Sequence, residues 1–242
     1  MKKSFLCIMA SILFAGILIG KPKITHSDKW VTYQYCDKKY YELCYVEELE
    51  QPEWVYYNLT VDETKDVIKR KDTFRSDPEI ITGSATNNDY LNSGYDKGHL
   101  ANCDDFRFSE DAMNSTFLLS NMSPQLPQFN RHGAWRESEK YGEELAIKFN
   151  DIDIITGPIF LSAKQIEYIG DKNKVAIPDG YFKIFYNQEN DFLECYIIWQ
   201  TDCAKKLNDY KTSLDIIQRM TGLIILLEWK KNKYGGIPTV FH

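Results

Sequence analysis

The residues best suited to chemistry stand together at positions 96 to 99, where the sequence reads Asp-Lys-Gly-His. The chain has only four histidines, and this one lies among polar and charged neighbours. A neutral imidazole has a pKa near 6.5, so His99 can accept a proton from water at ordinary pH. The sequence contains no G-x-S-x-G elbow, P-loop, Rossmann glycine fingerprint or C-x-x-C pair. Proton transfer by His99 is therefore the chemistry that the sequence favours.

Short motifs occur in a fixed order on both sides of this tetrapeptide. EWVYYNLT and RKDTFRSDP stand upstream, and FLLSNMSPQLPQFNRHGAWRESE, IITGPIF and MTGLII stand downstream. With DKGH as a D-[RK]-G-H signature, the series over about residues 50–225 resembles the DNA/RNA non-specific endonuclease family, within the ββα-metal nuclease superfamily. The resemblance implies an endonuclease that hydrolyses phosphodiester bonds of DNA and RNA and leaves 5′-phosphates.

The same resemblance assigns roles to a base and a metal ligand. It implies that His99 is the general base and that the amide oxygen of Asn130 binds Mg²⁺, with Mn²⁺ or another divalent cation as alternatives. Such a cation acts as a Lewis acid on the phosphate and the leaving oxygen. Mg²⁺ prefers oxygen ligands and keeps several waters, so one protein ligand suffices. Without the resemblance, an asparagine at a helix start would be interpreted as a cap.

Basic side chains are expected to hold the scissile phosphate. Arg70 matches the family's upstream catalytic arginine, and Arg75 is the alternative because the spacing varies there. Lys97 replaces the commoner arginine of the motif, and a lysine keeps the charge but loses the planar fork. Asp96 and Arg131 are expected beside it at the substrate. Whether Asp96 orients the loop or the neighbouring base stays open.

The spacing after Asn130 departs from the family pattern. The family has N-x-x-x-W, whereas here Trp135 follows Asn130 by five residues. Counted back from the tryptophan, Glu139 matches the acidic residue that supports the metal's waters. On one unbroken helix, however, Glu139 would face away from Asn130 and Glu137 would share its face. Either the insertion precedes the regular helix and Glu139 is the functional acid, or Glu137 has taken its place.

The elements that must position these residues follow from hydrophobic periodicity. Alternating aromatic and polar positions predict early strands over residues 29–59, and β-rich runs predict later ones at DIDIITGPIF, YFKIFY and FLECYIIW. Helices are expected at 60–70, from residue 128 to about 150, and from Ser213 to Gly222. Residues 79–106 are expected to be a long irregular loop. The predicted class is α+β, a mixed or antiparallel central sheet flanked by helices with a ββα-metal motif.

The first 20 residues have the pattern of a targeting segment. Two lysines precede an apolar run, as in a secretory signal peptide, with an uncleaved anchor as the alternative. The run is short for a membrane span, which needs about 20 apolar residues. Residues 21–242 are expected to form a single nuclease domain. The predicted location is secreted, periplasmic or extracellular.

Cysteine usage and charge restrict the function less sharply. Cys36 can pair with Cys44, and Cys195 with Cys203, leaving Cys103 free, or all five can be reduced packing residues. Taken alone, the net charge of −6 argues against a nucleic-acid binder, because neutralising phosphates favours clustered lysine and arginine. Residues 65–75, with five basic and two acidic side chains, leave room for a basic cleft.

The combined prediction is an exported, Mg²⁺-dependent endonuclease with DNA and RNA as substrates. Two alternatives remain open at this point. One is a catalytically inactive relative that only binds nucleic acid or a protein partner. The other is a disulfide-stabilised surface protein with no nucleic-acid role. A homodimer is neither required nor excluded by the sequence.

Overall fold

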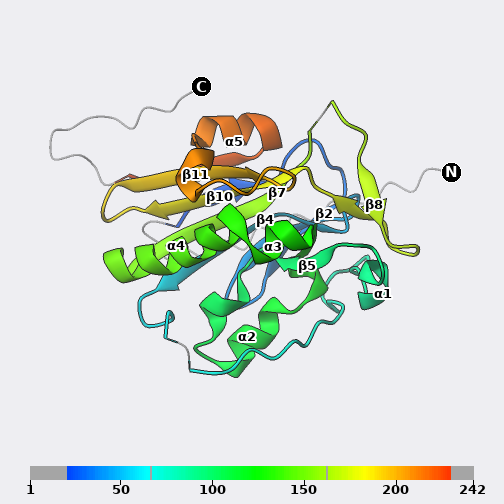
Figure 1. The fold of residues 1–242 in the computed structure, drawn as a ribbon, viewed down its shortest axis with the longest axis horizontal. Helices are drawn as coiled ribbons and strands as arrows, with labels where there is room; N and C mark the ends of the chain where they lie inside the picture. Colours follow the sequence, from blue (N-terminus) through cyan, green and yellow to red (C-terminus); the bar gives the residue numbers. More distant parts are fainter. Residues whose placement is uncertain (1–20, 66, 162, 230–242) are drawn as a thin grey trace.

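Seven antiparallel strands form the central sheet of the structure, a computed structural model that describes residues 21–65, 67–161 and 163–229. The strands follow the order β12-β11-β10-β7-β4-β3-β2. Their bounds are β2 (Tyr33–Asp37), β3 (Glu42–Val46), β4 (Gln51–Thr60), β7 (Asp151–Ile159), β10 (Gly180–Asn187), β11 (Phe192–Trp199) and β12 (Lys211–Thr212). Helix α4 lies against one face and helix α5 against the other (Figure 1). The predicted α+β class is confirmed, and every pairing in this sheet is antiparallel.

The middle strands are buried on both faces, as β10 illustrates. Alternate side chains of a strand point to opposite faces. Tyr181 and Phe185 accordingly join the core under α4, whereas Phe182 and Ile184 join the core under α5. This two-sided burial accounts for the almost unbroken apolar sequence of the strand, in which Lys183 is the exception.

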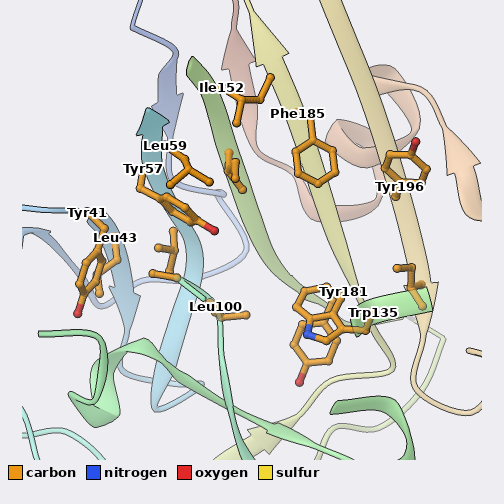
Figure 2. Packing of buried hydrophobic residues seen from close by; sticks show 14 of the residues in the cluster. Tyr41, Leu43, Tyr57, Leu59, Leu100, Trp135, Ile152, Tyr181, Phe185 and Tyr196 are labelled. Atoms are coloured by element: carbon orange, nitrogen blue, oxygen red, sulfur yellow. The ribbon is translucent and has the colours of Figure 1, made fainter. Parts of the chain in front are cut away.

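Helix α4 (Gly133–Phe149) is anchored to the sheet by its first turn. The Trp135 ring lies 5.1 Å from that of Phe129 and 5.3 Å from that of Tyr181, measured between centroids. Figure 2 shows Trp135 beside Tyr181, with Phe185 and Tyr196 farther along the same face. Complete burial of one such aromatic side chain contributes roughly 1.5–3 kcal/mol. The packing therefore fixes both the start and the rotation of α4.

Helix α5 (Leu214–Thr221) begins and ends where the sequence predicts. The Ser213 hydroxyl accepts the Ile216 N–H at the N-terminus, and Gly222 adopts a left-handed φ of +81° at the C-terminus. The chain then forms β13 (Ile224–Leu226), which pairs with β1 (Lys23–Thr25). This small sheet and α5 cover the face opposite α4.

A separate two-stranded antiparallel sheet lies beside α3, on the α4 side of the large sheet (Figure 1). It consists of β5 (Asp96–His99) and β6 (Met122–Gln125), and α3 (Pro127–Arg131) follows directly. Strand–strand–helix is the order expected of the ββα motif. The remaining elements are α1 (Asn87–Tyr90), η1 (Cys103–Phe106), α2 (Glu110–Thr116), η2 (Leu119–Asn121), β8 (Glu167–Ile169), β9 (Val175–Ile177) and η3 (Leu207–Tyr210). Residues 79–106 are thus less irregular than predicted.

The helix predicted over residues 60–70 is wrong. Thr60 ends β4, residues 61–64 form turns, and the described residues from 65 to 70 are bent or irregular. The N–H groups of Val67 and Ile68 both donate to the carbonyl of Arg107, each at 3.1 Å. These tertiary hydrogen bonds occupy N–H groups that would otherwise donate within a helix. They hold the segment against the C-terminal end of η1.

The cysteines are buried and unpaired in the described part of the chain. Cys36 packs in the core under α4, whereas Cys44 packs in the core under α5. Cys195 and Cys203 are divided between the same two cores. Because the sheet separates both candidate pairs, neither predicted disulfide forms, and the cysteines act as small packing residues.

Candidate active site

The two-stranded sheet of β5 and β6 places His99 at the end of β5, opposite Met122 of β6. Its neighbour Gly98 packs directly against β6. A Cβ atom at position 98 would lie 2.1 Å from the side-chain carbon Cδ of Gln125, which is completely buried. A side chain at position 98 would therefore displace the buried Gln125 side chain, which glycine leaves in place.

The His99 imidazole is buried between aromatic rings at the wall of a cleft. It is 7% exposed, and its ring centroid lies 4.8 Å from that of Phe117 and 5.5 Å from that of Phe74. Its Nε2 has no hydrogen-bond partner among the described residues. Burial, assisted by the Arg70 charge, lowers the pKa of His99 to about 3. The imidazole is consequently neutral at ordinary pH and retains a nitrogen lone pair that can accept a proton.

Asn130 is held by the aspartate that opens the DKGH motif. Its Nδ2 donates to Asp96 at 3.0 Å, and the Arg131 guanidinium donates to both oxygens of the same carboxylate, at 2.8 and 2.6 Å. Partial burial opposes ionisation of Asp96, but these hydrogen bonds outweigh it and lower the pKa of Asp96. With Nδ2 engaged, the amide of Asn130 is oriented so that Oδ1 is its remaining acceptor.

The extra residue after Asn130 is absorbed by a break between two helices. Asn130 lies in α3, and His132 caps the start of α4. Gly133 has a φ of +66°, and a Cβ there would lie 2.2 Å from the carbonyl oxygen of Cys203. The Ala134 N–H donates to that same carbonyl at 2.9 Å. The insertion therefore precedes the regular part of α4. Asn130 and Glu139 do not lie on one unbroken helix, so the expectation that Glu139 would face away from Asn130 does not apply.

Of the two candidate acids, Glu139 lies at the cleft. It is 8% exposed and lines the same hollow as His99 and Asn130. Glu137 points elsewhere, because its carboxylate accepts the N–H of Leu207 at 2.9 Å. The geometry thus favours Glu139 over Glu137.

The cleft has a cavity volume of about 500 Å³, room for a hydrated cation and a phosphate. The basic residues that line it are Arg70, Lys97, Arg131 and Arg136. Lys97 lies with its Nζ 4.6 Å from the centroid of the Phe74 ring. Arg75, the alternative to Arg70, lies outside this cleft and donates to the carbonyl of Asn114 at 2.9 Å. Acidic and amide side chains, among them Asp72, Asp104 and Asn102, line the same cleft.

Comparison with known proteins decides the family. The model of the DNA/RNA non-specific endonuclease family matches residues 23–232. The chain belongs to this family. This match confirms the resemblance inferred from the motifs. Members of the family are metal-dependent nucleases.

Relatives in this endonuclease family are about 30% identical to the chain over the aligned residues. Human mitochondrial endonuclease G is 33% identical over 201 residues, which cover 77% of this chain and 67% of the relative. The mitochondrial nuclease of Saccharomyces cerevisiae is 29% identical over 207 residues, covering 76% of this chain and 62% of the relative. A crystal structure of EndoG in complex with EndoGI superposes with a TM-score of 0.73 at 27% identity, covering 80% of this chain and 86% of that one.

These endonuclease relatives overturn the expected location. Human endonuclease G and the yeast nuclease are named as mitochondrial proteins, so the prediction of a secreted or periplasmic protein is wrong. A short apolar run behind two lysines indicates targeting without specifying the destination. The predicted signal peptide at residues 1–20 lies outside the described residues. In the part of the chain that the structure describes, no helix is long and apolar enough to cross a membrane.

Four charged residues around Glu139 were not predicted from the sequence, namely Asp104, Asp105, Arg136 and Lys183. Arg136 donates to Glu139 at 2.9 Å and to Asp104 at 3.0 Å, and so links α4 to η1 across the cleft floor. Lys183 and Asp105 lie deeper and interact electrostatically with Glu139. A lysine within the apolar strand YFKIFY was the available signal, because lysine is almost never fully buried unless it is paired.

Proposed function

We propose that this protein is a metal-dependent endonuclease that hydrolyses phosphodiester bonds in DNA and RNA with little sequence preference. The single observation that carries the proposal is the orphaned Nε2 of the buried His99, in a cleft that Asn130 and four basic side chains also line. A buried polar atom without a hydrogen-bond partner lowers the stability of the fold, so its presence points to a functional role. We take residues 21–242 as one nuclease domain.

His99 is proposed as the general base. Its neutral imidazole would take the proton of the attacking water through the ring nitrogen that carries the lone pair. The aromatic rings of Phe74 and Phe117 fix the plane of the imidazole, so the lone pair has one direction. The burial that keeps His99 neutral also weakens its basicity, so proton transfer depends on water entering the cleft beside it.

Asn130 is proposed as the protein ligand of a divalent cation, with Mg²⁺ the first candidate. The side chains fit a hard cation, because Asp96 occupies the Nδ2 donor of Asn130 and leaves its amide oxygen available. No group of three or more His, Cys, Asp or Glu side chains suited to a metal occurs among the described residues. The cation would therefore keep most of its waters, and when bound it would supply Lewis-acid stabilisation of the phosphate.

Glu139 is proposed to accept hydrogen bonds from waters held at the cation. Its carboxylate lies at the cleft floor, where Arg136 fixes one of its oxygens at 2.9 Å. An ionised carboxylate accepts hydrogen bonds through both oxygens, so the second oxygen can serve the water network.

Arg70, Lys97 and Arg131 are proposed to bind the phosphate backbone. Each presents positive charge to the cleft. Arg131 is partly committed to Asp96, whereas Arg70 shares its guanidinium with Asp72 at 2.8 Å. Contacts with phosphate position a nucleic acid without reading its bases, which supports weak sequence preference and the use of both DNA and RNA.

The test uses the full chain on plasmid DNA and on single-stranded RNA, with Mg²⁺ and with chelator. His99→Ala should lose at least about 100-fold in cleavage rate, in keeping with loss of a general base. Asn130→Ala should lose cleavage because the cation loses its protein ligand. The matched control is His132→Ala, an exposed histidine that should leave cleavage unchanged. If the wild type binds nucleic acid but cleaves neither substrate with any divalent metal, the protein is a binding relative and the proposal is wrong.

A further inference from the structure

A short helix contacts the lysine of the DKGH motif. Helix α1 lies beside β5 (Figure 1), and the Lys97 Nζ donates to Oδ1 of Asn87, the first residue of α1, at 3.2 Å. Asn87 is exposed, so water competes for both groups. The hydrogen bond can direct the lysine only if the asparagine is itself held in place.

The side-chain amide of Asn87 is held at its nitrogen. Nδ2 donates to the backbone carbonyl of Phe74 at 2.9 Å. The reverse orientation of the amide would set an N–H group against the Lys97 ammonium and one carbonyl oxygen against another, so the hydrogen bonds allow a single orientation. Asn87 therefore offers the lysine an acceptor whose direction is already set.

Helix α1 is anchored to the body of the protein. The backbone N–H and the hydroxyl of Thr86 both donate to Oδ2 of Asp89 at 2.7 Å, which caps the start of the helix. Nδ2 of Asn173 donates to the same oxygen at 2.8 Å. Tyr90 is buried in a hydrophobic cluster that includes Met122 of β6. The helix is thus fixed relative to the β5–β6 sheet.

The ring of Phe74 contacts the lysine from a second side. The Lys97 Nζ lies 4.6 Å from the ring centroid, within the range of cation–π attraction. Partial burial lowers the pKa of Lys97, whereas the carboxylates of Asp72 and Asp96 oppose that shift and favour the charged form. An ammonium has three donors, so its bond to Asn87 leaves others for a ligand in the cleft that Lys97 lines.

We propose that Asn87 is a positioning residue, which directs the Lys97 ammonium toward nucleic-acid phosphate in the cleft. The inference rests on the proposed function, because it deepens the role given to Lys97 there. An arginine presents a rigid planar fork, whereas a lysine carries a point charge on a flexible stem. With lysine in the motif, the direction of the charge has to come from neighbours, and Asn87 and the Phe74 ring supply it.

The first experiment measures kcat and KM for cleavage of single-stranded DNA with Mg²⁺ by wild type, Asn87→Ala, Lys97→Met and the double variant. Asn87→Ala should raise KM by about three- to tenfold, in keeping with the loss of one hydrogen bond, and leave kcat nearly unchanged. Lys97→Met should raise KM at least as much, and the double variant should match Lys97→Met alone. The matched control is Asn88→Ala, the neighbouring exposed asparagine of α1, which should behave as wild type.

A different route from Asn87 to the site runs through its hydrogen bond to Phe74, whose ring lies 5.5 Å from that of His99. If Asn87 acts by that route, Asn87→Ala lowers kcat and has the same effect in the Lys97→Met background. Either result would overturn the inference, as would an unchanged KM in Asn87→Ala.

An arginine at position 97 tests the reason for the asparagine. The guanidinium fork is pre-organised, so in the Lys97→Arg background the effect of Asn87→Ala should shrink below about twofold. An undiminished effect would show that Asn87 does not act by directing a flexible lysine. Thermal unfolding of Asn87→Ala should stay within about 2 °C of wild type, as for a surface substitution. A larger drop would assign the asparagine to the stability of the loop and overturn the inference.

The second experiment measures binding of the same strand in the presence of chelator, by filter binding over a range of salt concentrations. Lys97→Met should reduce the slope of log affinity against log salt by about 0.7, the value for one lost phosphate contact with a single strand. Asn87→Ala should weaken binding in the wild-type background and not in Lys97→Met. If the wild type binds but does not cleave, the proposed function fails and this cycle still tests the inference. If the wild type cleaves and Asn87→Ala binds equally well, the inference alone is wrong.

Discussion

Acid should destabilise this protein through His99, and substitution of that residue should remove the effect. The folded chain holds the imidazole neutral, with its pKa lowered to about 3 by burial and by the charge of Arg70. In the unfolded chain the same group has its ordinary pKa near 6.5. Between these two values the unfolded state binds more protons, so the free energy of unfolding falls as the pH falls.

The magnitude follows from the width of that window. Each pH unit below 6.5 removes about 1.4 kcal/mol until the folded-state pKa is reached. At pH 5 the loss from His99 is therefore about 2 kcal/mol relative to pH 7.5. That is a large part of the 5–15 kcal/mol that stabilises a typical protein. His99 is only 7% exposed, so solvent screens the effect little.

Urea unfolding at pH 7.5 and pH 5, in the presence of chelator, measures the effect for wild type and His99→Asn. The variant cannot titrate, so it should lose about 2 kcal/mol less than wild type between the two pH values. His132→Asn, which removes an exposed histidine, should keep the wild-type slope. If His99→Asn shows the same pH dependence as wild type, the imidazole is not buried in its neutral form. The reasoning that makes His99 the general base is then wrong.

Three further outcomes are expected from other parts of the site. Gly98→Ala should lower the free energy of unfolding by about 1–3 kcal/mol, the usual range for overpacking, because a methyl group there meets the buried Gln125 side chain; urea unfolding measures it, and no change would mean that the Gln125 side chain moves aside without loss of stability. Arg70→Ala should weaken nucleic-acid binding and reduce its salt dependence, whereas Arg75→Ala, outside the cleft, should change neither in a filter-binding titration. Asp96→Ala should raise the Mg²⁺ concentration that gives half-maximal cleavage, since Asn130 loses the acceptor that orients it; an unchanged metal requirement would assign Asp96 to the loop alone.

The sequence predicted the sheet well because its strands carry the signal locally. Runs such as YFKIFY and FLECYIIW are buried on both faces, so nearly every residue is apolar or aromatic. The short α5 was also predictable, since Ser213 and Gly222 mark its ends. The segment over residues 60–70 failed for the opposite reason. Its local pattern suits a helix, but its N–H groups are bound by a carbonyl some 40 residues away in the chain.

The cysteines and the buried lysine mark a second limit of sequence analysis. Equal spacing within two cysteine pairs suggested disulfides, yet the sheet separates the members of each pair. Which face a residue occupies depends on the register of its strand, and register is a property of the pairing between strands. Lys183 escaped notice for the same reason, because its partners come from α4 and η1.

The one-residue insertion shows why the site can tolerate a change in motif spacing. In a single continuous helix, an extra residue would rotate every following side chain by about 100°. Here the residue is added between α3 and α4, where His132 and Gly133 make a break. Asn130 is oriented from β5 by Asp96, whereas Glu139 is fixed by α4 through the packing of Trp135. Because different elements hold the two side chains, the cleft keeps both, and their separation in sequence is free to vary.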